Sequence, residues 1–382
     1  MSESLPPDWD PRSVSVLADQ RRAYDHMREQ CPVAWSDYSY WSVFRHADVS
    51  RILHDHQSFS SNASRHISVP NGMDPPQHTA YRNIIEDYFS VERMALFEPA
   101  CRGIAEDLAK EALDDDQAEL MADFAQPFAL RIQCAFMGWP MSLQAPLNSW
   151  ATRSNKATLA RDRTALSALA AEFDELIAGL LTERRKPDAP EDLTSALMKE
   201  QVNGRTLNDQ EIASILRNWT VGEVGTIAAA IGIIAEFLAS NPDVQQQLRD
   251  DPELLWKAND EILRIHGPLV DNRRRTTCPV QIGDRQIGAD QRVTINWVSA
   301  NRDPEVFPEP DSFSLERDPA LNLLYGAGIH VCPGAPLARM ELVIVIEKLL
   351  EHTERLQLMD NQPASLATYP SSGYASLPMR LR

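Results

Sequence analysis

The chain has 382 residues, enough for one large domain or for two or three smaller ones. It carries 37 basic and 55 acidic residues, and this net charge of −18 argues against nucleic acid or anionic membranes as general partners. The five cysteines include no CxxC pair, which excludes the usual zinc and redox motifs and indicates a reducing compartment.

The N-terminal residues 1–7 are polar and broken by proline, without the basic and apolar regions of a signal peptide. The most apolar stretch, residues 221–239, contains Glu223 and Glu236, which favours a core helix over a membrane span. We therefore expect a cytoplasmic protein without a membrane anchor.

Apolar residues spaced three and four apart predict a largely helical chain. The expected helices cover residues 19–29, 46–55, 78–88, 91–113, 122–137, 143–155, 165–185, 192–200, 209–239, 242–250, 252–266 and 336–350. Asn241-Pro242 and Asp251-Pro252 fit an N-cap followed by proline in the first helical turn.

Strand signals are short. Residues 32–35 and 40–44 flank a polar turn, and residues 280–287 predict a hairpin closed by Gly283-Asp284. Residues 292–297 alternate, and another hairpin is expected around residues 371–374. No repeat or linker marks a boundary, so we predict a single domain over residues 1–382, mainly α with small β-sheets at one edge.

One cysteine stands in a glycine-rich loop directly before a helical pattern. A thiolate at a helix start is stabilised by the helix dipole and by free backbone N–H groups, and glycines let the backbone approach a flat, bulky group. The combination suits a thiolate ligand to haem iron, although a lone cysteine is more often a small buried hydrophobic residue. The run is Tyr325-Gly326-Ala327-Gly328-Ile329-His330-Val331-Cys332-Pro333-Gly334.

This run resembles the haem-binding signature of the cytochrome P450 family, with Tyr325 at the position where Phe is usual and Leu337-Ala338-Arg339 in the following helix. The resemblance implies the P450-like fold and a haem b cofactor (iron protoporphyrin IX). It also implies that Cys332 ligates the iron and that Tyr325, His330 and Gly334 bind the cofactor.

Glu261 and Arg264 share a helix face, so their side chains can pair. Their place in the chain matches the buried Glu–Arg pair of the family, a structural element to which a third basic residue usually contributes. Ser312 stands where that arginine is common, and Arg317 is the candidate in its place.

His78 and Arg82 are one turn apart on a predicted helix, after Asp-Pro-Pro. The segment is similar to the family element whose histidine and arginine hold the haem propionates. By the same resemblance Arg273 is expected to bind a propionate, with Arg274 or Arg275 as alternatives.

In the family, a Gly-x-Asp/Glu-Thr run bends the long helix over the haem, and its acid and alcohol relay protons. Here Gly222 matches the family glycine and is expected to border the cofactor, but Val224 and Gly225 stand at the acid and alcohol positions. Glu223 and Thr226 are each displaced by one residue, and we predict them as catalytic residues, brought into place by a π-type bulge. The alternative is that the two glycines are packing sites.

The run of residues 217–223 also resembles the subgroup fused to a flavin and iron–sulfur reductase. The chain given ends at residue 382 without such a domain, so the expected electron donor is a separate ferredoxin or flavin/iron–sulfur reductase. Arg339 is expected near the face where that donor docks.

The resemblance implies a bacterial-type haem-thiolate monooxygenase that inserts one oxygen atom from O2 into a small or medium apolar substrate, including aromatic ones, by hydroxylation or oxidative dealkylation. No carboxylate-binding cluster is visible. The pocket is expected at residues 62–72, 143–166, 219–226, 268–272, 297–301 and 373–374. The alternatives are a peroxide-driven oxygenase, a non-catalytic haem sensor or carrier, and a helical protein without a cofactor.

Overall fold

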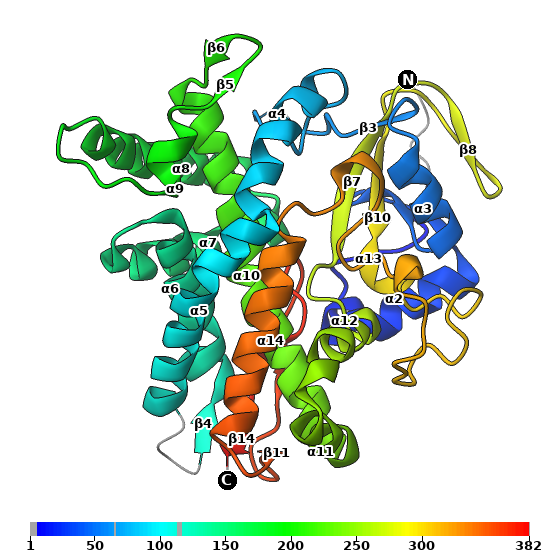
Figure 1. Cartoon of the computed structure of the whole chain (residues 1–382). Helices are drawn as coiled ribbons and strands as arrows, with labels where there is room; N and C mark the ends of the chain where they lie inside the picture. The colour runs from blue at the N-terminus through cyan, green and yellow to red at the C-terminus, as the bar shows by residue number, and fades with distance from the viewer. Residues whose placement is uncertain (1–5, 65, 113–116, 382) are drawn as a thin grey trace.

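The computed structural model describes residues 6–64, 66–112 and 117–381. Residues 1–5 and Leu113, the expected end of one helix, lie outside the described residues. Figure 1 shows a helical body with the largest sheet at one side and a smaller sheet near the C-terminus.

The helices follow the predicted ones closely, with small shifts at their ends. They are α1 Val14–Ala18, α2 Gln20–Gln30, α3 His46–His54, α4 Gln77–Glu86, α5 Val91–Ala112, α6 Gln126–Met137, α7 Gln144–Ala160, α8 Arg163–Arg184, α9 Leu193–Leu197, α10 Asp209–Ser240, α11 Pro242–Asp250, α12 Leu255–Ile265, α13 Trp297–Ala300 and α14 Ala335–Glu351. Short helical turns are η1 Asp87–Phe89, η2 Met121–Ala125 (a π turn), η3 Met141–Leu143, η4 Pro252–Leu254, η5 Pro319–Leu321 and η6 Gly328–His330.

The strands form one large sheet and several small ones. A five-stranded sheet has the order β1-β2-β10-β7-β3, a three-stranded sheet has the order β11-β14-β4, and three two-stranded sheets pair β12 with β13, β5 with β6 and β8 with β9. The strands are β1 Val33–Ser36, β2 Tyr40–Val43, β3 Phe59–Ser60, β4 Gln117–Glu119, β5 Gln201–Val202, β6 Arg205–Thr206, β7 Asp271–Thr276, β8 Val280–Ile282, β9 Arg285–Ile287, β10 Arg292–Asn296, β11 Leu356–Leu358, β12 Ser365–Leu366, β13 Tyr374–Ser376 and β14 Pro378–Leu381.

Strand β7 is the main element that the sequence did not predict. Its residues Asp271–Thr276 include three consecutive arginines, and a polar run of this kind shows no alternation of apolar residues. Backbone pairing with β10 and β3 on its two sides holds it in the sheet. Tertiary hydrogen bonding therefore overrides the weak local signal.

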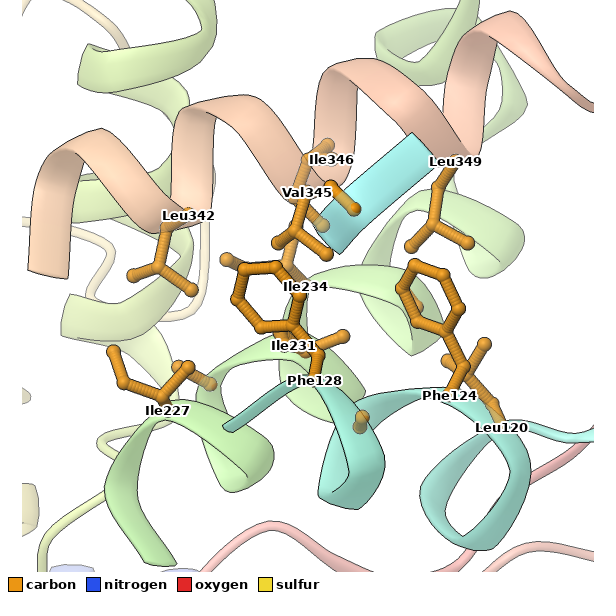
Figure 2. Close-up of a cluster of buried hydrophobic side chains, with 14 of the residues drawn as sticks. Leu120, Phe124, Phe128, Ile227, Ile231, Ile234, Leu342, Val345, Ile346 and Leu349 are labelled. Atoms are coloured by element: carbon orange, nitrogen blue, oxygen red, sulfur yellow. The ribbon is translucent and has the colours of Figure 1, made fainter. Parts of the chain in front are cut away.

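Helix α10 runs through the centre of the helical body. The Asn208 side chain accepts from the backbone N–H of Glu211, and the Glu211 side chain accepts from that of Asn208, which closes a capping box at the helix start. Figure 2 shows the core where η2, α6, α10 and α14 meet. Its large side chains are Leu120, Phe124, Phe128, Ile227, Ile231, Ile234, Leu342, Val345, Ile346 and Leu349.

By length and composition alone, α10 could also cross a membrane. In the most apolar window of the helix, however, 61% of the residues are buried inside the molecule. Its apolar side chains pack against α6 and α14, as the sequence predicts for a core helix.

The proline starts are placed as predicted, but the caps differ. Pro242 opens α11, yet Asn241 makes no side-chain cap hydrogen bond to that helix. Instead its amide nitrogen donates to the carbonyl oxygen of Phe237 (2.8 Å), near the end of α10. The asparagine therefore closes the preceding helix and does not cap the following one.

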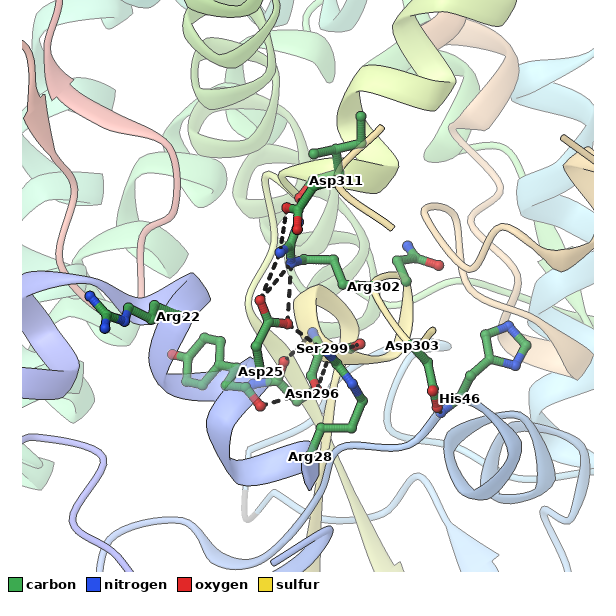
Figure 3. A network of polar contacts seen from close by, with 12 residues as sticks. Arg22, Asp25, Arg28, His46, Asn296, Ser299, Arg302, Asp303 and Asp311 are labelled. Carbon is green, nitrogen blue, oxygen red and sulfur yellow. Dashed lines mark hydrogen bonds and ion pairs between the residues drawn. The ribbon is translucent and has the colours of Figure 1, made fainter. Parts of the chain in front are cut away.

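A polar network fixes the N-terminal helix α2 to the loop around α13 (Figure 3). Arg302 pairs with Asp25 and with Asp311, each at 2.7 Å. Arg28 donates to Asp25 and to the carbonyl oxygen of Ser299, each at 2.8 Å. Because Arg28 and Arg302 are buried and both pair with Asp25, the network fixes the position of the segment that follows the large sheet.

Candidate functional site

The loop cysteine Cys332 lies between η6 and α14. Its backbone N–H donates to the carbonyl oxygen of Tyr325 (2.8 Å), which closes the loop. The backbone N–H groups of Gly334 and Ala335 donate to its sulfur. Burial raises the pKa of Cys332, whereas these two bonds and the charge of Arg82 oppose that shift. A metal cation bound to the sulfur would favour the thiolate.

The other described cysteines show what a purely structural cysteine looks like here. Cys101 and Cys134 are buried, and burial raises the pKa of Cys134 to about 11. Cys332 differs from both: protein atoms surround its sulfur and raise its pKa, yet the residue keeps solvent-accessible surface. The interpretation as a small buried hydrophobic residue therefore fits Cys101 and Cys134 and does not fit Cys332.

Two glycines give the loop its shape. Gly326 and Gly328 have φ angles of 75° and 66°, in the left-handed region that favours glycine. A Cβ at Gly328 would lie 2.3 Å from the carbonyl oxygen of Leu53, so the loop packs directly on the end of α3. A side chain at this position would push the cysteine loop away from its support.

The two predicted histidines meet in the interior. His78 of α4 is 2% exposed, and its ring lies 4.3 Å from the ring of His330 between centroids. The Nε2 atoms of both rings are buried without a hydrogen-bond partner. Burial, and then the charge of Arg274, lowers the pKa of His330 to about 3, so this ring is neutral near pH 7.

Arg273 and Arg274 lie on opposite faces of β7, because side chains alternate along a strand. Arg274 is 7% exposed and lies close enough to His330 to shift its pKa. Arg273 instead forms a hydrogen bond with the Tyr369 side chain. The third residue, Arg275, pairs with Asp290 at the surface. Of the three arginines that the sequence offered, the geometry therefore favours the alternative Arg274 over Arg273.

Arg82 and Arg274 supply two positive charges beside the histidine pair. Arg82 donates to Glu86 (2.7 Å), and Arg274 has no ion-pair partner among the described residues. Burial lowers the pKa of Arg274 to about 10, which still leaves it charged near pH 7. Two cations and two unpartnered imidazole nitrogens are what a group with two carboxylates requires. The residues present therefore fit haem with its propionates.

The face of α10 that borders the site carries small residues. A Cβ added at Gly222 or Gly225 would meet no atom within 4 Å, and Val221 is 58% exposed. Gly225 is four residues after Val221 and three after Gly222, so it shares a helix face with each of them. A flat ligand can approach the helix backbone closely here.

The predicted catalytic pair on α10 is not brought together at this face. The helix is α-helical from Asp209 to Ser240, so the expected π-type bulge does not form. The carboxyl group of Glu223 faces Glu341 of α14, close to Cys101, and Thr226 is half-buried beside it. Glu223 points toward the core because the unbroken helix turns it by 100° per residue away from Gly222.

The carboxyl group of Glu341 is the partner that sequence reasoning missed. Glu341 is fully buried, and it contacts Glu223 in hydrogen-bonding range. Burial raises the pKa of Glu223 to about 7 and that of Glu341 well above its ordinary value. The sequence gives no signal of this pair, because the position of an acid along its own helix does not show which residue of another helix lies beside it.

The polar residues that precede the glycines on α10 hold a loop in place. Arg217 donates to the carbonyl oxygen of Ile67 (3.0 Å), and Asn218 donates to that of Val69 (2.9 Å). The next residue, Trp219, packs edge-on against Phe89 at 5.3 Å. This run therefore sets the position of the loop between β3 and α4.

The predicted structural pair is present and buried. Arg264 is 1% exposed and donates to Glu261 (2.8 Å) and to two backbone carbonyl oxygens. Arg317, the candidate for the third basic residue, donates to Glu261 at 2.9 Å. A buried pair needs such additional hydrogen bonds to offset its desolvation.

Arg339, expected at the docking face, is already engaged. It pairs with Asp260 (2.9 Å), and its guanidinium lies 4.5 Å from the ring of Tyr325. Burial raises the pKa of Tyr325 well above its ordinary value. Arg339 therefore braces the tyrosine that opens the cysteine loop, and its charge is largely compensated.

A cavity of about 700 Å³ borders the small-residue face of α10. Its lining includes Gly225 and Ala229 of α10, Asn148 and Asn155 of α7, and Tyr374 near the C-terminus. Three of the segments predicted for the pocket, 143–166, 219–226 and 373–374, contribute to it. His66 is exposed, and Trp219 packs on Phe89 instead of lining this cavity.

Comparisons with known proteins show the family of the chain. A family model described as Cytochrome P450 matches residues 142–370. The erythromycin C-12 hydroxylase of Saccharopolyspora erythraea is 31% identical over 362 residues, which cover 90% of this chain and 90% of that protein. The cyclomarin C epoxidase CymV of Salinispora arenicola is 29% identical over 334 residues, which cover 83% of this chain and 84% of the relative.

Among solved structures, cytochrome P450 CYP109Q5 from Chondromyces apiculatus has a TM-score of 0.86 at 27% identity, covering 98% of both chains. The chain belongs to the cytochrome P450 family. Its relatives are named as monooxygenases, hydroxylases and epoxidases, so the protein is an oxidoreductase that incorporates oxygen. Membership of the family implies a haem cofactor.

Proposed function

We propose that this chain is a haem-thiolate monooxygenase in which Cys332 ligates the iron of haem b. The observation that carries the proposal is the environment of one sulfur atom. Cys332 keeps accessible surface within an otherwise enclosed loop, and two backbone N–H groups donate to its sulfur. Two unpartnered histidines lie nearby, His78 on α4 and His330 on the same loop as the cysteine.

The cationic residues would hold the carboxylates of the cofactor. His78, Arg82, Arg274 and His330 lie near one another, and the buried Nε2 atoms of the two histidines have no hydrogen-bond partner. Tyr325 and Gly334 shape the loop around Cys332, and Gly222 and Gly225 leave room beside α10. At each of these positions, a side chain of another size or charge would disturb the geometry on which the role depends.

When bound, a haem with a thiolate ligand supplies the activation of O2, and the thiolate pushes electron density that favours O–O cleavage. The residues of the chain contribute the rest. The N–H groups of Gly334 and Ala335 moderate the charge on the sulfur of Cys332. The wall formed by α10 keeps polar side chains away from the reacting face, since Val221, Gly222 and Gly225 carry no ionisable group.

The substrate would be a small or medium molecule that occupies the cavity beside Gly225. Relatives named as an erythromycin hydroxylase and a cyclomarin epoxidase support hydroxylation or epoxidation of C–H or C=C bonds. We further propose a cytoplasmic protein that forms one domain over residues 1–382 and takes electrons from a separate ferredoxin or flavin/iron–sulfur reductase.

A peroxide-driven oxygenase is a second candidate, favoured by one observation. The face of α10 beside the site carries neither an acid nor an alcohol, because Glu223 is held by Glu341 and the unbroken helix leaves Gly225 at the expected alcohol position. An enzyme that starts from hydrogen peroxide receives its protons with the oxidant and has less need of such a relay.

Spectroscopy tests the proposed ligand. The reduced, carbonyl-bound protein should show the red-shifted Soret band of thiolate-ligated haem, and Cys332→Ala should lose it while Cys134→Ala keeps it. A Cys332→Ala protein that retains the band defeats the assignment. Turnover with hydrogen peroxide alone, faster than turnover with ferredoxin and NAD(P)H, would select the second candidate.

A further inference from the structure

Three arginines from distant parts of the chain gather beside Leu159 and Tyr369, two residues that line the cavity. Arg161 ends α7, Arg273 lies in β7 and Arg292 lies in β10. The sequence showed no cluster of this kind because more than a hundred residues separate the first arginine from the other two. The chain as a whole carries a net charge of −18, so a local group of cations is unusual here.

Strand register places two of these arginines on one face of the five-stranded sheet. Arg273 is opposite Thr294 of β10, and Arg292 is two residues before Thr294. Side chains two residues apart in a strand share a face. Tyr40 of β2 lies on the same face, and its ring contacts the Arg292 guanidinium at 5.1 Å and the Arg161 guanidinium at 5.2 Å.

The partners of these arginines are neutral oxygens. Arg161 donates to the carbonyl oxygens of Asp37 (2.6 Å) and Tyr38 (2.7 Å), Arg292 donates to that of Ala63 (3.4 Å), and Arg273 bonds with Tyr369. None of the three forms an ion pair with a carboxylate in the described ranges of the chain. Asp271 is the nearby acid, and its carboxyl group interacts with the charge of Arg273 and with the Tyr369 side chain, without forming an ion pair with Arg273.

The positive charges lie close enough together to lower the pKa of one of the arginines. Burial, and then the positive charge of Arg273, lowers the pKa of Arg292. Two guanidinium groups that repel each other in a partly desolvated place are stabilised by a shared anion.

The cluster is continuous with the cavity. Tyr369 lines the cavity and bonds with Arg273, and Leu159, near the end of α7, lines it too. Tyr38 packs edge-on against Tyr369 at 5.7 Å, and its hydroxyl group donates to the carbonyl oxygen of Thr158 (2.7 Å). Arg273 therefore adjoins the rim of the cavity through Tyr369, and Gly225 and Ala229 stand in the apolar wall.

We propose that Arg273, with Arg292 and Tyr369, binds an oxyanion, a carboxylate or a sulfonate, at one end of an otherwise apolar substrate. This inference rests on the proposed function and names the substrate class for its cavity. An anion held at the rim directs the apolar end toward Gly225, so oxidation falls at a carbon distant from the charged group.

Calorimetry with matched probes tests the proposal without requiring turnover. The purified holoprotein is titrated with decanoate, decane-1-sulfonate and decanamide, and with biphenyl-4-carboxylate and its primary amide. We expect the anions to bind about tenfold more tightly than the amides, with a difference that narrows as salt is added. Because the overall field of the protein repels anions, such a preference reports a local site.

Variants assign the preference to residues. Arg273→Gln should weaken anion binding about tenfold and leave amide binding unchanged. Arg275→Gln is the control, because it removes one positive charge from the same strand at a residue that pairs with Asp290. It should leave the binding of both anions and amides unchanged. If Arg273→Gln does not fold, Arg292→Gln and Tyr369→Phe serve instead. The relative affinity of decanoate and decane-1-sulfonate decides between the two oxyanions.

Equal affinity for anion and amide, or a preference that survives in Arg273→Gln, overturns the inference. A different result would contradict the proposed function. An anion preference in a protein without the thiolate Soret band would leave this site standing and remove the monooxygenase. If only neutral compounds give oxidised products, the monooxygenase stands and this anion site is removed.

Discussion

Glu223 of α10 and Glu341 of α14 face each other in the interior with no cation between them. Their carboxyl oxygens have no partner other than each other, so one group must hold a proton to bridge the contact. The larger rise in pKa belongs to Glu341, which therefore donates to Glu223. The residue that the sequence marked as a proton relay is a member of this pair.

The pair makes stability depend on pH. The pKa of Glu223 is about 7 in the folded protein and 4.5 without the fold, so the folded state holds an extra proton between these values. The free energy of unfolding falls as pH rises through this window. Glu223→Gln removes the contribution of Glu223 and leaves that of the buried Glu341, so we expect the variant to be more stable than the wild type near pH 8 by up to about 3 kcal/mol, and by little near pH 5.

Denaturant unfolding at the two pH values measures this difference. Glu347→Gln is the control, since Glu347 pairs with Arg102 at the surface of the same helix α14. Its effect should be small and similar at both pH values. An equal effect of Glu223→Gln at both pH values would contradict the shared proton.

Arg274, rather than Arg273, should retain the cofactor. Arg274→Gln removes a buried cation beside His330, and we expect haem to pass to an excess of a haem scavenger about tenfold faster. Arg273→Gln and Arg275→Gln should lose haem at the wild-type rate, because their side chains lie elsewhere. Faster loss from Arg273→Gln than from Arg274→Gln would reverse the assignment.

Glu261 supports a fully buried arginine. Glu261→Gln leaves Arg264 charged at 1% exposure, and we expect unfolding to become easier by about 3 kcal/mol or more. Arg317→Gln should cost less, about 1 kcal/mol, because Arg264 continues to neutralise Glu261. Chemical denaturation ranks the two variants, and the opposite ranking would show that Arg317 is the essential partner.

Substitutions at Gly328 and Gly326 distinguish two effects of adding a side chain to the cysteine loop, the strain of a positive φ and a clash with a neighbouring segment. Both have positive φ, but only at Gly328 would a Cβ strike a backbone atom, the carbonyl oxygen of Leu53. Gly326→Ala should cost about 1–2 kcal/mol from the backbone conformation alone. Gly328→Ala should cost more and displace Cys332, which the intensity of the thiolate Soret band would report. Equal losses would mean that the contact with Leu53 is adjustable.

Local sequence determined most of the helices and the chemistry of the loop. Apolar spacing was sufficient to place α10 and α14, since a helix that packs on a core must carry its large residues on one face. The residues around Cys332 were sufficient to place the cysteine at a helix start, because glycine conformations and the helix dipole are local properties.

Tertiary structure decided what depends on neighbours. Whether Arg273 or Arg274 faces His330 depends on the pairing of β7, a strand without a local signal. The pairing of Glu223 with Glu341 requires α14 to pack on α10, and the arginine cluster requires the end of α7 to meet the sheet. Periodicity along one segment fixes directions around that segment's own axis, whereas charges from separate segments acquire partners only when the chain is folded.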